Sequence, residues 1–226
     1  MFDIAPLFIS VRSSLLATVI VFIFGLLFAR LFLYSCGKTR WITDVLFTLP
    51  MVLPPTVVGF LLLVVFGENG FLGRLLSQFG IRVIFSWQAT VLAAVVVSFP
   101  LMYRAAKGAM EQVDDTLVWA ARTLGMKERQ IFIKVLIPEA LPGIVAGVVV
   151  SFARALGEFG ATLMIAGNIP GRTQTIPTAI YFSSASGDMR TATIWVSIIT
   201  IVSCIVLALL NIRHIHRHAA KRGDFR

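Results

Sequence analysis

Five long stretches of apolar residues alternate with shorter polar segments along the chain. They cover residues 13–35, 45–66, 87–106, 140–166 and 191–212. An α-helix needs about 20 apolar residues to cross the hydrocarbon core of a bilayer, and each stretch is about that long. The segment 68–86 is too polar for a sixth crossing, so we expect a short helix at the outer surface there. The pattern predicts an all-α integral membrane protein with about five transmembrane helices.

The composition supports a lipid environment. Of the 226 residues, 58% are hydrophobic and 14% are charged, and the mean hydropathy is +0.88. A soluble domain usually carries about a quarter charged residues. One globule of this size could not bury so many apolar side chains, so we expect a multi-pass protein of the cell (inner) membrane.

The net charge of +9 is distributed unevenly along the chain. Fourteen of the twenty Lys and Arg residues lie around the turn after the first stretch (from Arg30 to Arg40), in the segment 104–134 and after Ile212. Loops facing inward carry such an excess, which places the N-terminus outside and the C-terminus in the cytoplasm. No continuous basic face with interleaved aromatic residues is visible, so nucleic acid is not an expected partner. The basic tail, 214–226, is expected to lie near anionic lipid headgroups.

Prolines and polar residues within the apolar stretches mark a candidate translocation path. Proline in a membrane helix frees backbone carbonyls, and helices broken in this way often line a path, although any single proline could simply bend a helix for packing. Three prolines within LPMVLPPTVVGF favour a path in the second stretch; Pro100 and Pro142 fall in the third and fourth. The candidate path residues are Pro50, Pro54, Pro55, Thr56, Ser98, Ser151, Arg154 and Glu158.

Arg154 and Glu158 are four residues apart within the fourth stretch and share one helical face. An ionisable pair in a membrane is costly and faces a neighbour or a water-filled cavity. The pair could flank the path or transmit helix movement, or it could neutralise itself within the helix, and both interpretations stay open. Arg172 in an outer loop is a candidate contact for an oxyanion or a binding protein, or is simply solvated.

The segment between Trp119 and Pro138, WAARTLGMKERQIFIKVLIP, is charged where its surroundings are apolar. Asp114 or Asp115 can cap a first short helix, and Gly125 stands where a left-handed glycine would end it. The apolar positions of this helix are Leu117, Ala120, Ala121 and Leu124, and those of a second, which runs to Pro138, are Ile131, Phe132, Val135 and Leu136. A helical hairpin joined to membrane helices at both ends could transmit force from a soluble partner. An amphipathic hairpin lying on the bilayer is the alternative.

This hairpin resembles the EAA loop of ABC importer permeases, whose pattern is E-A-A-x3-G-x9-I-x-L-P. Alanines, glycine and terminal proline match, whereas Trp119 replaces the acidic residue, so a salt bridge from that acid is not expected here. In the family the short helix docks into a cytoplasmic ATPase subunit. The resemblance therefore implies a coupling loop at 107–138, with Ala120, Ala121, Leu124, Gly125, Met126 and Pro138 as its coupling residues.

Three further segments, LPMVLPPTVVGFLLL, FARALGEFGATLMIAGNIPG and RTQTIPTAIY, are similar to molybdate permeases, with sulfate permeases as close relatives. The resemblance implies a type I importer fold over residues 11–213. It also implies a homodimer, two ATPase subunits that bind ATP–Mg, and an external binding protein that delivers molybdate or tungstate. A sulfate or thiosulfate permease is the alternative.

The chain itself is not expected to be an enzyme. It has no Gly-rich phosphate loop of the GxxxxGK[ST] kind, so we expect no cofactor on this chain and ATP on another one. It also has no nucleophile–base constellation and no metal-ligand spacing. A membrane-embedded enzyme would need clustered ionisable groups within the membrane, and a stand-alone channel or secondary transporter would leave the hairpin without a purpose.

Overall fold

The computed structural model describes residues 3–35 and 37–223, and this part of the chain consists of helices joined by short connections. The helices in chain order are α1 (Ala5–Phe32), α2 (Gly37–Val52), α3 (Pro55–Phe66), α4 (Phe71–Ser77), α5 (Trp87–Glu111), α6 (Asp115–Thr123), α7 (Glu128–Ile131), the π-helical turn η1 (Phe132–Leu136), α8 (Ile137–Leu156), α9 (Gly160–Ala166), α10 (Ile176–Ala185) and α11 (Met189–Gly223).

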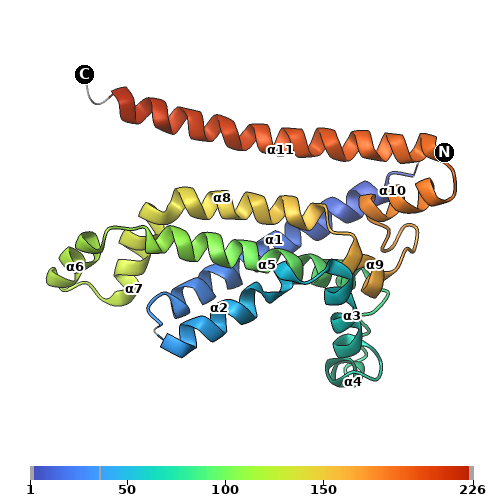
Figure 1. Cartoon of the computed structure of the whole chain (residues 1–226), viewed down its shortest axis with the longest axis horizontal. Coiled ribbons are helices and arrows are strands. Elements are labelled where there is room, and N and C mark those ends of the chain that lie inside the picture. The colour runs from blue at the N-terminus through green and yellow to red at the C-terminus, as the bar shows by residue number, and fades with distance from the viewer. Residues whose placement is uncertain (1–2, 36, 224–226) are drawn as a thin grey trace.

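The core of the molecule is formed by α1, α5 and α8, which run side by side (Figure 1). Small residues let these helices approach closely, as is typical of helix contacts in membranes. A Cβ added at Gly147 would lie 2.5 Å from the Ala105 Cβ, and one added at Gly143 would lie 2.6 Å from the Ala109 Cβ. Between α1 and α5, a Cβ added at Gly25 would lie 2.7 Å from Met102 Cγ. This close packing makes α1, α5 and α8 the firm part of the fold.

The predicted all-α architecture is confirmed, with four to five apolar helices. Among the described residues, four helices are long and apolar enough to cross a membrane, and α2 and α3 make a fifth candidate if their bent pair counts as one span. The bend between α2 and α3 is 111°. It falls at Pro54 and Pro55, whereas α2 continues through Pro50, α5 through Pro100 and α8 through Pro142.

The predicted fourth stretch, 140–166, is not one straight helix. The helix that supplies it begins earlier, at Glu128, continues through η1 and ends at Leu156. Residues 157–159 separate it from α9. Proline rules could not locate this break, because no proline lies there; Gly157 stands at the end of α8 instead.

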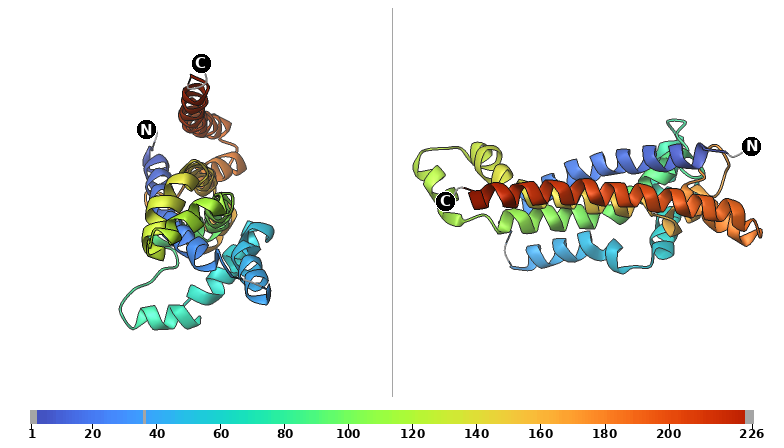
Figure 2. Two further views of the ribbon diagram at one scale, coloured as in Figure 1. Left: turned by 90° about the vertical axis from the view of Figure 1, so that its left-hand side faces the viewer. Right: turned by 90° about the horizontal axis from the view of Figure 1, so that it is seen from above.

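The two ends of the bundle carry different structures. Figure 1 and the right view of Figure 2 place α6 and α7 at the end where α11 finishes, and α3, α4, α9 and α10 at the end where α1 begins. The short helix predicted within 68–86 is confirmed as α4. The direction in which the bundle crosses the membrane stays a prediction from charge. The side chains of the predicted basic tail, 214–226, lie outside the described residues.

Candidate coupling and translocation site

The helix α6 is defined by caps at both ends. The Asp114 carboxylate accepts a hydrogen bond of 2.9 Å from the Thr116 backbone N–H, which caps the N-terminus and lowers the pKa of Asp114 below its usual value. At the other end Gly125 has φ +76°, the Gly125 N–H donates to the Arg122 carbonyl, and the Met126 N–H donates to the Ala121 carbonyl. These two bonds form a Schellman motif. The predicted cap and the predicted glycine stop are both confirmed.

The apolar residues of α6 divide between two faces. Val118 and Ala121 are buried in the same core cluster as α1, α5 and α8. Leu117 and Ala120 are exposed, and Leu124 is 82% exposed. The prediction that Leu117, Ala120, Ala121 and Leu124 form one buried stripe is therefore wrong. Of these four residues Ala121 is buried, and the residue buried beside it is Val118, three positions earlier. An exposed apolar face remains available for another protein.

The connection from α6 to α8 is helical almost throughout. Arg122 Nε donates to Glu128 Oε1 at 2.8 Å, which joins α6 to α7, and the Arg122 guanidinium carbon lies 5.2 Å from the centre of the Trp119 ring. Trp119 thus offers a ring face where the EAA pattern has an acid. The predicted second helix does not end at Pro138. It passes through η1 into α8, and Pro138, in the first turn of α8, has no N–H to donate to the η1 turn before it.

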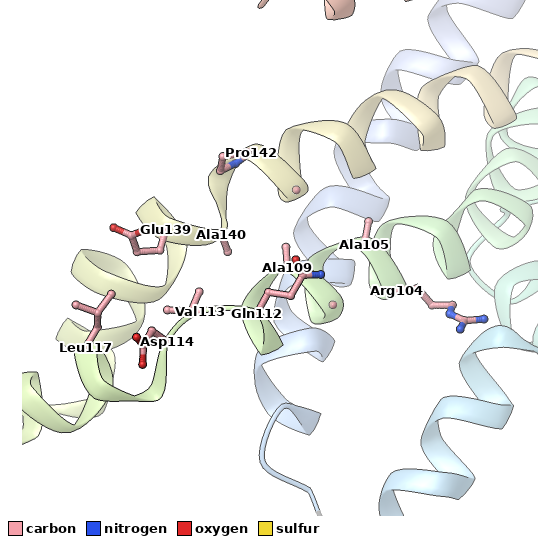
Figure 3. A pocket seen from close by; sticks show the side chains of 12 residues that line it. Arg104, Ala105, Ala109, Gln112, Val113, Asp114, Leu117, Glu139, Ala140 and Pro142 are labelled. Atoms are coloured by element: carbon pink, nitrogen blue, oxygen red, sulfur yellow. The ribbon is translucent and has the colours of Figure 1, made fainter. Parts of the chain in front are cut away.

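A groove of about 640 Å³ separates the start of α6 from α5 and α8 (Figure 3). Leu117 and Asp114 line it on the side of α6, Glu139 lines it on the side of α8, and Ala109 lines it further along α5. Small side chains at this junction leave α6 unsupported along part of its length. The buried residues that anchor the hairpin to the core are Val118 and Ala121 of α6, Ile131 of α7 and Leu136 of η1.

At the opposite end, the two breaks in the predicted membrane helices lie next to each other. A Cβ added at Gly160, the first residue of α9, would lie 3.0 Å from Pro55 Cβ and 3.3 Å from the Thr56 nitrogen. One added at Gly59 of α3 would lie 2.8 Å from Ala161 Cα. The structure thus brings Pro55 and Thr56, predicted from the second stretch, against the segment that follows Glu158.

Arg154 and Glu158 form an ion pair, with Arg154 Nη1 2.7 Å from Glu158 Oε2. Glu158 is only 2% exposed, and it lies beyond the end of α8 rather than within a continuous helix. Its other oxygen, Oε1, accepts a 2.8 Å hydrogen bond from the Ala161 backbone N–H. Glu158 therefore neutralises Arg154 and also ties the end of α8 to the start of α9, a role that the i,i+4 spacing could not predict.

The remaining predicted path residues are dispersed. Ser98 and Ser151 are fully buried, and the Ser98 hydroxyl donates to the Ala94 carbonyl within α5. Pro50 lies within α2, and Arg172 is exposed in the connection between α9 and α10. The assignment of these residues to a path or to a partner contact stays a prediction.

A charged cluster between α2 and α5 was not predicted. The Lys107 ammonium donates to both Asp44 oxygens, at 2.6 and 2.8 Å, and the Tyr103 hydroxyl donates to Asp44 Oδ1 at 2.7 Å. One turn further along α5, Glu111 accepts a 2.9 Å hydrogen bond from Arg40. The only signal in the sequence was an aspartate directly before an apolar stretch, because its partners lie about 60 residues away.

The chain matches the model of a family described as "Binding-protein-dependent transport system inner membrane component" over residues 21–221. The chain belongs to this family. It is therefore an inner-membrane permease component and not an enzyme. The Molybdenum transport system permease protein ModB of Escherichia coli strain K12 is 49% identical over 76% of both chains. The Sulfate transport system permease protein CysT of the same organism is 35% identical, over 90% of this chain and 73% of CysT.

Solved structures share the permease fold. The MetNI methionine ABC transporter in an inward-facing conformation aligns with a TM-score of 0.76 over 93% of each chain, at 17% identity. A chain of a bacterial alginate ABC transporter, solved with its periplasmic protein bound to an alginate pentasaccharide, aligns with a TM-score of 0.73 over 97% of this chain and 80% of its own, at 20% identity. The predicted importer permease fold is confirmed.

Proposed function

We propose that this permease is the transmembrane subunit of an ATP-driven importer that moves molybdate or tungstate into the cytoplasm. The observation that carries the proposal is its similarity to the ModB permease of Escherichia coli, which is greater than its similarity to the sulfate permease CysT. The hairpin adds a physical argument. An exposed apolar face on a capped helix needs a partner, and a soluble ATPase subunit supplies one.

The proposed assembly contains two copies of this chain, two ATPase subunits and an external binding protein. ATP–Mg binds to the ATPase subunits, and this chain binds no cofactor. Leu117 and Leu124 contact the ATPase on the cytoplasmic side, while Arg172, at the opposite end of the bundle, faces the binding protein or the arriving oxyanion. This orientation agrees with the excess of Lys and Arg at the end of the bundle that carries α6.

In this proposal, the binding protein determines selectivity and the permease provides a gated passage. A tetrahedral dianion is strongly hydrated, and tight binding requires several converging donors or positive charges. Arg154 is already neutralised by Glu158, and the Ser98 hydroxyl is bound within its own helix. Such a passage binds anions weakly enough to release them.

The experiment is uptake of labelled molybdate by the full transporter reconstituted in liposomes with its binding protein. We expect uptake that requires ATP and the binding protein, and that competes with excess unlabelled tungstate and not with sulfate. Competition by sulfate and thiosulfate alone would identify a sulfate permease. Uptake without ATP would identify a channel or secondary transporter and contradict the coupling role of the hairpin.

A further inference from the structure

The helix α2 is attached to the molecule along one side only. None of its residues is fully buried, and it packs chiefly against α5. Trp41, Leu46 and Val52 are large apolar side chains of α2 that remain exposed. The position of α2 therefore depends on a small number of contacts with its neighbour.

Those contacts are polar up to the middle of α2 and aromatic in the next turn. Asp44 binds both Tyr103 and Lys107, and Lys107 is only 5% exposed although it carries a charge. About one turn beyond Asp44, the Phe47 ring lies edge-on to Tyr103, with centroids 5.1 Å apart, and 5.0 Å from Phe28 of α1. Apolar and aromatic contacts tolerate sliding, whereas a charged cluster has one geometry in which every donor is satisfied. The cluster thus specifies where α2 lies.

The far end of α2 is a natural hinge. The two residues after Val52 separate it from α3, the two helices meet at 111°, and Pro54 and Pro55 have no N–H with which to continue a helix. The helix α3 is held separately, through the close contact of Gly59 with α9. A rotation of α2 about Leu53 and Pro54 would leave α3 in place.

The charged cluster lies immediately before the coupling helix. Lys107 and Glu111 are one turn apart in the last two turns of α5, and α6 begins at Asp115. A force applied to α6 therefore acts on the residues that hold α2. A cavity of about 560 Å³ borders Asp44, Lys107, Arg40 and Glu111, so water has access to these groups when they separate. Asp44, Arg40 and Glu111 are partly exposed, so water can replace their partners at low cost, whereas the buried Lys107 must gain contact with the water of this cavity when the pair separates.

We propose that Asp44, Tyr103 and Lys107, assisted by the Arg40–Glu111 pair, are an α2 latch that couples the position of α2 to movement of the coupling helix α6. Movement of α6 by the ATPase separates the latch and releases α2 to rotate about Pro54. These are positioning residues, since they act on the passage through α2. The proposal rests on the proposed function as far as an ATPase drives α6, and it does not depend on which oxyanion is carried.

The test measures ATP hydrolysis by the purified full transporter, with and without loaded binding protein, for Asp44→Asn and Tyr103→Phe. Both variants keep the size of the side chain and remove a charge or a hydroxyl. We expect the ratio of stimulated to unstimulated hydrolysis to fall roughly threefold or more, the factor expected when one net hydrogen bond is lost, while the unstimulated rate is retained or higher. A purely structural role would lower the amount of assembled complex and leave the ratio unchanged.

The matched control is Glu68→Gln. Glu68 pairs with Arg82 at 3.7 Å in the segment around α4, and both side chains are more than 80% exposed. The control should behave as the wild type, and Asp44→Glu, which keeps the charge, should recover part of the ratio. An unchanged ratio in assembled Tyr103→Phe and Asp44→Asn complexes would overturn the latch. Wild-type hydrolysis that no binding protein stimulates would instead count against the proposed function.

Discussion

Single residues of this permease often serve two partners, and Glu158 is the clearest case. One carboxylate oxygen contacts Arg154, and the other accepts a hydrogen bond from the Ala161 backbone N–H. The side chain therefore joins the charged Arg154 to the start of α9, across the interruption between α8 and α9. The sequence predicted the pair from its spacing but not the second bond, because nothing in the sequence located the end of α8. A prediction based on helical periodicity assumes that the helix continues.

This double role changes the expected mutational pattern at Glu158. Glu158→Ala removes a hydrogen bond to a charged group and leaves Arg154 without its anion, which we expect to cost about 2 kcal/mol of stability, since Arg154 is partly exposed. The double change of Arg154 and Glu158 to Ala should recover only part of that loss, because the Ala161 N–H stays without its acceptor. Thermal unfolding of the purified complexes measures the loss of stability in the single and in the double variant.

Glu158→Gln provides the comparison, because its amide oxygen can still accept from Ala161. It should be more stable than Glu158→Ala. Full recovery of wild-type stability by the double alanine variant would mean that the bond to Ala161 contributes nothing.

The exposed side of α6 allows a test that leaves the fold intact. Leu124 is 82% exposed, so Leu124→Glu should insert and fold as the wild type does, and should lose ATP-driven uptake because a charge would be buried on docking to the ATPase. Leu75→Glu, at an exposed leucine of α4 at the other end of the bundle, is the control. Copurification of the ATPase with each variant gives the measurement, and normal recovery with Leu124→Glu would contradict the docking role.

Gly125 tests the geometry of the same helix. A β-branched side chain at φ +76° is strained by about 1–2 kcal/mol although the surrounding space is open. Gly125→Val should therefore distort the hairpin and reduce uptake without preventing membrane insertion, whereas Gly125→Asn, which tolerates the left-handed conformation, should retain most of it. Equal uptake by the two variants would show that the conformation of Gly125 is unimportant.

At the scale of whole elements, apolar periodicity and caps predicted most of the helices, and they failed where the cause lies in tertiary contacts. The bend at Pro54, the cap at Asp114 and the stop at Gly125 each have a local cause. The break after Leu156 and the pairing of Asp44 with Lys107 do not, since each depends on a partner in another element or beyond a helix end. Prolines alone were a poor guide, as α5 and α8 continue through theirs.

The contact of α3 with α9 gives a prediction at this scale. A side chain at Gly59 would meet the backbone of Ala161, which cannot move aside as a flexible side chain would. Gly59→Val should force the two helices apart at a cost of about 1–3 kcal/mol and impair uptake. Gly108→Ala is the matched control, since a Cβ there meets nothing within 4 Å. Extraction yield, thermal unfolding and uptake should separate the two variants, and equal behaviour would show that the close approach is dispensable.

The molecule as a whole has a firm centre and less strongly attached parts on its outside. The helices α1, α5 and α8 form the centre, α2 packs chiefly on α5, and α11 packs chiefly on α10 and stands apart from the centre (Figure 2). The apolar composition of the sequence and the family together place this molecule in the inner membrane. The sequence could not predict that Asp44 of α2 binds Lys107 just before the coupling helix α6. This contact depends on α2 packing against α5 in the folded chain.

Calorimetry can test whether the binding protein or the permease determines selectivity for the oxyanion. The purified permease without its partners should show no tight binding of molybdate by calorimetry, because the described residues contain no converging set of free donors in the core. Loaded binding protein should stimulate ATP hydrolysis by the full transporter. A saturable site on the permease alone that matched the binding protein in affinity, and that was lost in Arg154→Ala, would place selectivity in the membrane instead.

The π-helical turn η1 has a consequence for the loss of a single residue from the chain. A π turn closes its hydrogen bond over one more residue than an α turn, so a single π turn absorbs one extra residue within an α-helix. Removal of one residue between Phe132 and Leu136 should therefore yield an uninterrupted α-helix and leave α7 and α8 in nearly the same relative orientation. In a regular α-helix, by contrast, removal of one residue rotates the two flanks by about 100° relative to each other. The same deletion in α5 would displace every contact from Met102 to Lys107.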